Sequence, residues 1–149
     1  MFTESIALKG KVNIIHLDQF GNKKDEKNID NLVVTAGKSV IASRMAGNTS
    51  ALMSRMGVGT SSTTAVVGDT TLGAAIAAGN VALDSTTATA NAITYVATFP
   101  AGTGTGAVVE AGIFNGFPGV GSMLCRTVFS VVNKGVGDVI VITWVVSVS

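Results

Sequence analysis

The C-terminal stretch "VIVITWVVSVS" (139–149) carries the clearest β pattern in the chain. Every second residue would line one face of a strand, and this face is apolar: Ile140, Ile142, Trp144, Val146, Val148. The opposite face also carries apolar residues, namely Val139, Val141 and Val145. A strand that is apolar on both faces is typical of the centre of a sheet or of a surface beneath a partner chain.

Shorter stretches upstream have the same character. They are rich in β-branched and aromatic residues and are separated by Gly-rich or Pro-containing turns: "ALMSRMGVGT" (51–60), "ITYVATF" (93–99), "AVVEAGIFN" (107–115), "SMLCRTVFSVV" (122–132). Their spacing of about 10–15 residues is typical of a β-sandwich or jelly roll. We expect Ile113, Phe129 and Trp144 in its core. The stretch "TTLGAAIAAGNVAL" (70–83) is compatible with a short helix, a strand or a buried loop.

The N-terminal part predicts a hairpin over residues 5–34. Its apolar residues recur at period two and would share a face, while "FGN" (20–22) supplies turn residues: Ile6, Leu8, Val12, Ile14. The spacing changes after this hairpin and predicts one short helix near residues 36–46, capped by Thr35 and ended by Gly47. Its packed face would contain Ala36, Val40, Ile41, Arg44 and Met45. The prediction is therefore a mainly β protein, a single antiparallel β-sandwich domain over residues 1–149.

Composition indicates which partners the protein has. Ten basic and nine acidic residues give a net charge of +1, which creates no field that would attract nucleic acid or an anionic membrane. We therefore expect neither partner. The chain combines 47% hydrophobic with 13% charged residues and has a mean hydropathy of +0.51, so a soluble monomer would lack polar covering. This balance predicts an oligomer with apolar surface against another protein chain.

We expect no leader, membrane span or disulfide in this chain. "MFTESIALKGKVNII" (1–15) places Glu4, Lys9 and Lys11 within its apolar run, unlike a signal peptide. Residues 85–109 carry no charge but are rich in Thr and Gly and include a Pro, so they lack the apolar run of a spanning helix. The single Cys125 has no partner for an internal disulfide or a Cys-based zinc site.

Catalytic chemistry has few candidate residues. His16 is the one imidazole of the chain and lies in a polar-flanked strand, where we expect a surface or interface histidine, and a Ser or Cys nucleophile needs a base held by a third group. No usual metal-ligand spacing is present, and "GVGTSSTT" (57–64) and "GTGTGA" (102–107) lack the features of phosphate and dinucleotide loops. An acid–base pair of Glu110 with Asp69 or Asp84 has no support from spacing. We expect no catalytic residue, metal or cofactor.

Glu110 stands out because the surrounding region carries almost no charge. From Met56 to Val109 the only charged residues are Asp69 and Asp84. Strict alternation would place Glu110 on one face with Val108, Gly112 and Phe114, and the other face would hold Val109, Ala111 and Ile113. A buried Glu must be paired, and Arg126 on the next strand is the natural cross-strand partner. The sequence predicts a structural ion pair between Glu110 and Arg126.

Four stretches together resemble small structural proteins of tailed bacteriophages: "NLVVTAGKSVIASRM" (31–45), "MGVGTSSTTAVVGDTTLG" (56–73), "YVATFPAGTGTGAVVEAGIFN" (95–115), "MLCRTVFSVVNKGVGDVIVITWVVSV" (123–148). The resemblance implies a non-enzymatic virion protein made in the host cytoplasm. The absence of fibre-like repeats favours a capsid decoration, or cement, protein on the outer capsid surface. A tail, collar or fibre-base module involved in host attachment is the alternative.

A decoration protein would bind the major capsid protein and copies of itself, as a homodimer or homotrimer. Most of the charge lies in the first 38 residues, and the hairpin there would form an edge able to add strands to a partner. We expect the protein interface to include two groups, one in the hairpin and one in the last strand: Ile6, Leu8, Lys9, Lys11, Val139, Val141, Val145.

Overall fold

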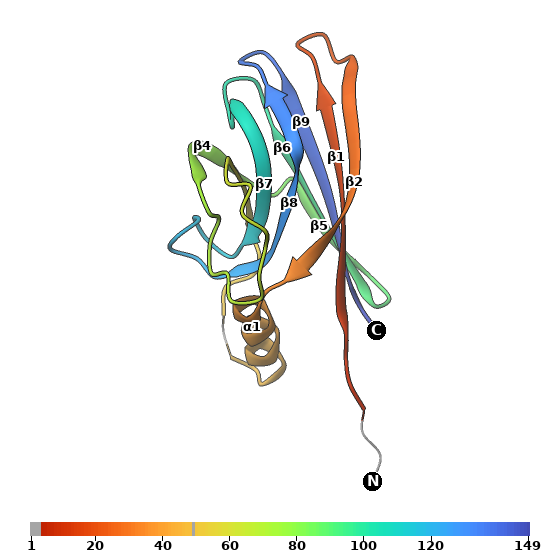
Figure 1. Cartoon of the computed structure of the whole chain (residues 1–149). Coiled ribbons are helices and arrows are strands. Elements are labelled where there is room, and N and C mark those ends of the chain that lie inside the picture. Colours follow the sequence, from red (N-terminus) through yellow and green to blue (C-terminus); the bar gives the residue numbers. More distant parts are fainter. Residues whose placement is uncertain (1–3, 49) are drawn as a thin grey trace.

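The computed structural model describes residues 4–48 and 50–149, and within them it has one helix and nine strands (Figure 1). Residues 1–3 of the expected 1–149 domain lie outside the described part. The elements are β1 (Leu8–Leu17), β2 (Lys23–Val33), α1 (Thr35–Met45), β3 (Arg55–Gly59), β4 (Ala75–Ala82), β5 (Ser85–Thr89), β6 (Ala92–Phe99), β7 (Gly106–Phe114), β8 (Met123–Lys134) and β9 (Val139–Val148). The prediction of a mainly β protein with one short helix is confirmed.

The strands form one antiparallel sheet in the order β4-β3-β7-β8-β2-β1-β9-β6-β5. The sheet curls into a half-barrel (Figure 1), and a sandwich or jelly roll of separate sheets is not confirmed. Strand β2 explains the difference, because it pairs with β1 along most of its length and with β8 through Leu32 and Val33. The bent strand β2 thus joins two halves of the sheet into one continuous ladder. One half consists of β4, β3, β7 and β8, and the other consists of β1, β9, β6 and β5.

The core lies inside this curl and takes residues from both halves. Strand β9 lies between β1 and β6, as its two apolar faces predicted. Trp144 is fully buried, and Ile113 and Phe129 lie in the same cluster. Val139, Val141 and Val145 lie on the outer face of β9 and are half-buried. The inner face of the sheet therefore holds the main core, and the outer face of β9 is partly covered.

Helix α1 lies where the sequence predicts it, but its start and its packed face differ from the prediction. Its N-cap residue is Val34, which makes no side-chain capping bond, and the Thr35 amide donates to the Val67 carbonyl at 2.8 Å. Gly37 is the buried residue of the helix, whereas Arg44 and Met45 are exposed. The close contact at Gly37 sets the helix against β8, and the exposed Arg44 and Met45 line an apolar cleft beside the helix.

The predicted N-terminal hairpin is present as β1 and β2, but β1 is not an edge strand. Strand β1 pairs with β2 on one side and with β9 on the other. Residues 23–31 of β2 have β1 as their hydrogen-bonded neighbour, because only Leu32 and Val33 of this strand pair with β8. The expectation of an edge hairpin is therefore wrong for β1 and holds only for the outer part of β2.

The edge strands are β4 and β5. The stretch 70–83, which the sequence leaves open between helix, strand and loop, forms β4 over residues 75–82 and has no helix or strand over residues 70–74. Strand β5 was not predicted, and all five of its residues are exposed. It carries no buried face, so it leaves no hydrophobic alternation in the sequence.

Candidate functional site

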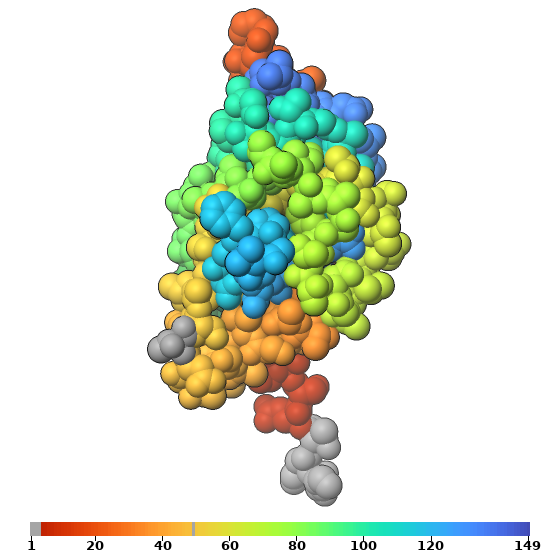
Figure 2. Space-filling view, turned by 90° about the vertical axis from the view of Figure 1, so that its left-hand side faces the viewer, coloured from red at the N-terminus to blue at the C-terminus, as the bar shows by residue number. Residues whose placement is uncertain are grey.

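The segment 60–74, between β3 and β4, contains no helix or strand and lies on the outer face of β7 and β8. We call it the β3–β4 loop. Irregular segments longer than about 12–15 residues are uncommon in compact domains and usually have a function. Figure 2 shows the loop at the surface in yellow-green, above the orange helix α1. Its conformation depends on a buried ion pair beneath it.

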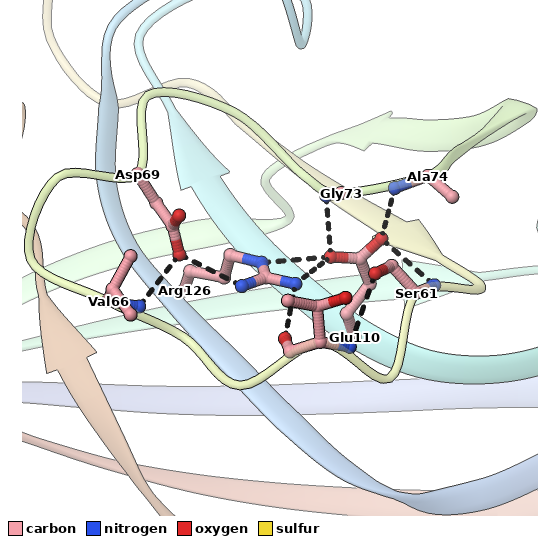
Figure 3. A network of polar contacts seen from close by, with 8 residues as sticks. Ser61, Val66, Asp69, Gly73, Ala74, Glu110 and Arg126 are labelled. Carbon is pink, nitrogen blue, oxygen red and sulfur yellow. Dashed lines mark hydrogen bonds and ion pairs between the residues drawn. The ribbon is translucent and has the colours of Figure 1, made fainter.

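The structure brings Glu110 and Arg126 together on the face of β7 and β8 opposite the main core (Figure 3). The Arg126 Nε donates to Glu110 Oε2 at 2.9 Å, and Nη2 lies 2.8 Å from the same oxygen. Arg126 faces Gly112 in the β7–β8 ladder, so the two charged side chains meet diagonally. Glu110 is 0% exposed and Arg126 is 2% exposed, so a charge left without its partner here would be costly.

The Nη1 and Nη2 nitrogens of Arg126 also bind the β3–β4 loop. Nη1 donates to Asp69 Oδ2 at 2.9 Å, and Nη2 donates to the Thr63 carbonyl at 3.0 Å. Asp69 Oδ2 also accepts the Val66 amide at 2.9 Å. Arg126 thus holds the middle of the loop at two points.

Glu110 binds both ends of the same loop. Its Oε2 accepts the Gly73 amide at 2.9 Å, and its Oε1 accepts the amides of Ala74 at 2.7 Å and Ser61 at 3.3 Å. A side chain at Gly59 would overlap Glu110 Oε1, so glycine at this position leaves room for the carboxylate. The backbone donors and the guanidinium together satisfy the buried charge.

An apolar contact adds to these polar anchors. Leu72 is 5% exposed and packs with Val34, Phe114 and Met123 in a small cluster on the outer face. By contrast, Val66 and Val67 of the same loop remain 55% and 52% exposed. The loop is therefore fixed against β7 and β8, and the side chains of Val66 and Val67 are exposed to solvent.

Sequence reasoning identified the pair but missed the rest of this network. Asp69 is one of two charged residues between Met56 and Val109, and this position is the available sequence signal for its role. The face assignment of Val108 was wrong, because a β-bulge between Val108 and Glu110 shifts the alternation and places Val108 in the main core with Ala111 and Ile113. Asp69 and Glu110, considered above as an acid–base pair, both bind Arg126.

His16 contradicts its sequence-based assignment as a surface or interface residue. It is 5% exposed, and its Nε2 lies 2.9 Å from Asp138 Oδ2. His16 follows Val12 and Ile14 at period two on the inner face of β1, which is why it is buried. Its partner lies in the β8–β9 turn, 122 residues along the chain, and local sequence could not indicate it.

Asp138 is the centre of a second polar cluster. Its Oδ2 accepts the Gly135 amide at 2.8 Å and lies 3.1 Å from Lys24 Nζ. The hydrogen bonds from Gly135, His16 and Lys24 lower the pKa of Asp138 well below its ordinary value. The buried Lys134 Nζ donates to the carbonyls of Asp138 at 2.6 Å and Pro100 at 2.9 Å, and burial lowers its pKa. This cluster ties the β8–β9 turn to the hairpin.

Most of the residues expected at a protein interface share the outer face of β1 and β9, where Lys11 is the direct cross-strand partner of Val145, whereas Leu8 lies on the opposite face. Ile6, Lys9 and Lys11 are exposed at the start of the chain. Leu8 is half-buried and lines an apolar cleft of about 390 Å³ between α1, residues 51–53 and the sheet. The valines of β9 lie on the outer face. Contact of these residues with a partner stays a prediction.

The described residues contain no group of three or more His, Cys, Asp or Glu side chains placed to hold a metal ion. Within residues 4–48 and 50–149, no helix has the length and apolar character needed to cross a membrane. Comparison with protein-family models, with curated proteins and with solved structures gives no match.

Proposed function

We propose that this protein is a non-enzymatic structural component of a phage virion, a capsid decoration protein that binds the major capsid protein on the outer surface of the shell. The tail, collar or fibre-base assignment is the alternative from the same motif resemblance. The observation that carries the proposal is the β3–β4 loop, which is rigidly anchored and presents exposed valines. A loop fixed before binding loses little conformational entropy when a partner docks on it.

The four stretches that carry the phage resemblance meet at this loop. Segment 56–73 supplies most of it, 95–115 supplies Glu110, and 123–148 supplies Arg126. Segment 31–45 reaches it through the hydrogen bond from the Thr35 amide to the Val67 carbonyl. The shared motifs are thus the parts that shape one surface loop, and this supports a binding module rather than a catalytic centre.

The chemistry of the buried polar groups also supports a structural role. Glu110 and Arg126 are enclosed by each other and by loop backbone, and His16 and Asp138 pair beneath the β8–β9 turn. Each buried charge is used to fix a loop. The exposed Val66 and Val67 of the β3–β4 loop are apolar groups on a fixed backbone that can recognise a neighbouring protein subunit.

Co-sedimentation tests the proposal. Purified protein is mixed with empty heads that lack it and, separately, with isolated tails, and each mixture is sedimented through a sucrose cushion. We expect the protein to sediment with heads. Binding to tails alone would replace the decoration assignment with the tail or collar alternative, and binding to neither would overturn the proposal.

Two variants locate the contact. The double variant Val66→Asp and Val67→Asp should lose binding, because it places charge on the exposed part of the loop without touching its anchors. The matched control is Val136→Asp, which changes a valine that is 74% exposed at the β8–β9 turn and should bind normally. Equal binding by the loop variant and the control would show that the β3–β4 loop is not the contact.

A further inference from the structure

The apolar cleft beside helix α1 has no role in the proposed function. It is lined almost entirely by hydrocarbon side chains from the helix, the segment after it and the inner face of the sheet, including Leu8, Ile41, Met53, Ile93 and Val148. Among its described lining residues, Arg44 is the one with a charge. A cleft of about 390 Å³ with apolar walls and one cation is suited to an apolar group that carries a single negative charge.

A segment with an apolar side chain and a single negative charge lies next to the cleft in the sequence, immediately before Leu8. Residues 4–7, "ESIA", have no helix or strand, all four are exposed, and Ile6 is 68% exposed. We call them the N-terminal arm. Glu4 is the one charged residue of the arm, and it takes part in none of the ion pairs found among the described residues. Figure 1 shows this part of the chain leading away from the sheet.

The arm does not fill the cleft of its own chain. Reciprocal hydrogen bonds between Ala7 and Ser149, at 2.8 and 2.9 Å, hold its base along β9, and Leu8 immediately afterwards lines the cleft. The preceding residues therefore point outward from the cleft's rim. If a second copy is placed against this rim, its arm reaches the cleft of the first copy. By symmetry, the arm of the first copy reaches the cleft of the second.

We propose that the N-terminal arm of one copy occupies the α1 cleft of a second copy, with Ile6 inserted among the apolar side chains and Glu4 paired with Arg44. The charges are complementary, since Glu4 is the arm's only charge and Arg44 is the only charge that lines the cleft among described residues. Arg44 already donates one hydrogen bond to the Ser50 carbonyl at 2.9 Å, which leaves further guanidinium donors for a carboxylate. This contact lies apart from the β3–β4 loop and does not depend on the proposed function.

Molar mass measured by light scattering over a wide concentration range tests the charge pair. Wild type should self-associate, and Glu4→Arg or Arg44→Glu should each weaken association by about tenfold or more, because each places like charges together. The double variant carrying both reversals should restore association. Lys38→Glu, an exposed change on α1 that does not line the cleft, is the control and should associate as wild type does. A monomeric wild type, or a double variant no better than the single ones, would overturn the proposal.

Disulfide trapping tests the location directly. The double variant Ile6→Cys and Leu52→Cys, with Leu52 lining the cleft, should form a disulfide-linked dimer under mild oxidation. A reducing agent should convert this dimer back to single chains. Cys125 is fully buried and burial raises its pKa, so it does not compete. Ile6→Cys combined with Val131→Cys, an exposed valine of β8, is the matched control. Equal cross-linking of both pairs would show that the arm does not enter the cleft.

Removal of residues 1–7 separates this inference from the proposed function. The deletion leaves β1 intact, since that strand begins at Leu8. The shortened protein should be monomeric and should still sediment with heads through its β3–β4 loop. If it instead associates as wild type does, a different surface joins the copies and the proposal fails.

Discussion

Arg126 shows how one residue can fix a loop. Its guanidinium binds Glu110, Asp69 and the Thr63 carbonyl at the same time. Binding these three acceptors at once needs a planar group with donors in several directions. A lysine ammonium is a point charge on a flexible stem and would not match this geometry. The loop conformation therefore depends on arginine at this position and not merely on a positive charge.

We expect Arg126→Met to lower the free energy of unfolding by about 3–5 kcal/mol, because it leaves Glu110 as a buried charge without its cationic partner. Lys38→Met, an exposed change on α1, should alter it by no more than about 0.5 kcal/mol. Urea unfolding followed by circular dichroism measures both. A loss at Arg126 as small as that at Lys38 would mean that the pair is open to solvent.

Asp138 predicts a pH-dependent contribution to stability. Its folded-state pKa lies below the ordinary carboxyl value, so its bonds to Gly135, His16 and Lys24 add stability at neutral pH. This contribution is lost as pH falls below the ordinary value, about 3.9, towards the folded value.

Asp138→Asn should therefore be less stable than wild type at pH 7, and the difference should shrink as the pH is lowered below about 4. Urea midpoints for both proteins at a series of pH values measure this difference. Asp30→Asn, an exposed change on β2, controls for general acid destabilisation. A difference between Asp138→Asn and wild type that stays constant down to acid pH would contradict the assigned role.

At the scale of elements, helix α1 is placed by a close contact. A Cβ at Gly37 would overlap the carbonyl oxygen of Leu124 on β8. Glycine in a helix interior normally destabilises it by about 0.5–1 kcal/mol relative to alanine, so its presence here is explained by the approach of the helix to the strand. The helix in turn forms one wall of the apolar cleft.

Gly37→Ala should destabilise the protein by about 1–3 kcal/mol, because the helix must move away from β8. Ser39→Ala, on an exposed position of the same helix, should leave stability unchanged or raise it by about 0.5 kcal/mol. Thermal unfolding compares the two. A rise in melting temperature for Gly37→Ala would mean that the helix is not in close contact with β8.

The elements differ in how far the sequence predicts them. Strands β6 to β9 and the N-terminal hairpin are predictable from the sequence, because each contains apolar, β-branched or aromatic residues at period two and is bounded by turn residues. Strand β5 has no buried residue, so it gives no such signal. Leu32 and Val33 join the two halves of the sheet by pairing with residues of β8 that are distant in sequence. The periodicity of a sequence does not indicate such long-range pairs.

The same limit applies to the candidate site. The Glu110–Arg126 pair was predictable, because a lone charge in an apolar region needs a nearby partner. The roles of Asp69 and Thr63 depend on the path of the β3–β4 loop, which irregular sequence does not specify. His16 was wrongly placed for a similar reason, since Asp138 reaches it only in the folded chain.

At the scale of the whole molecule, the half-barrel leaves several backbone edges open. Strands β4 and β5 end the sheet, and residues 23–31 of β2 pair only with β1. The last of these edges carries many of the chain's charges: Lys23, Lys24, Asp25, Glu26, Lys27, Asp30. Charged side chains on an open edge discourage pairing with other chains. We therefore expect copies of the protein to associate through the N-terminal arm and the α1 cleft, and not through the edge of β2.

The open edges raise the question of whether the two halves of the half-barrel unfold together. Trp144 lies on β9 in one half and Cys125 on β8 in the other, yet both belong to the same core cluster. The bent strand β2 also pairs with both halves. Separating them would expose the inner face of each, so an intermediate with one half folded would be strongly disfavoured.

We therefore expect a single cooperative transition. Trp144 is the chain's one tryptophan and Cys125 its one cysteine, so each reports on its own half without mutation. Wild type is equilibrated at increasing urea concentrations, and tryptophan emission is compared with labelling of the thiol by a short pulse of a thiol reagent. The two midpoints should coincide, because Cys125 is fully buried until the core opens. Labelling of Cys125 at urea concentrations where Trp144 emission is still native would show that the β8 half opens independently, and the half-barrel would then be two folding units joined by β2.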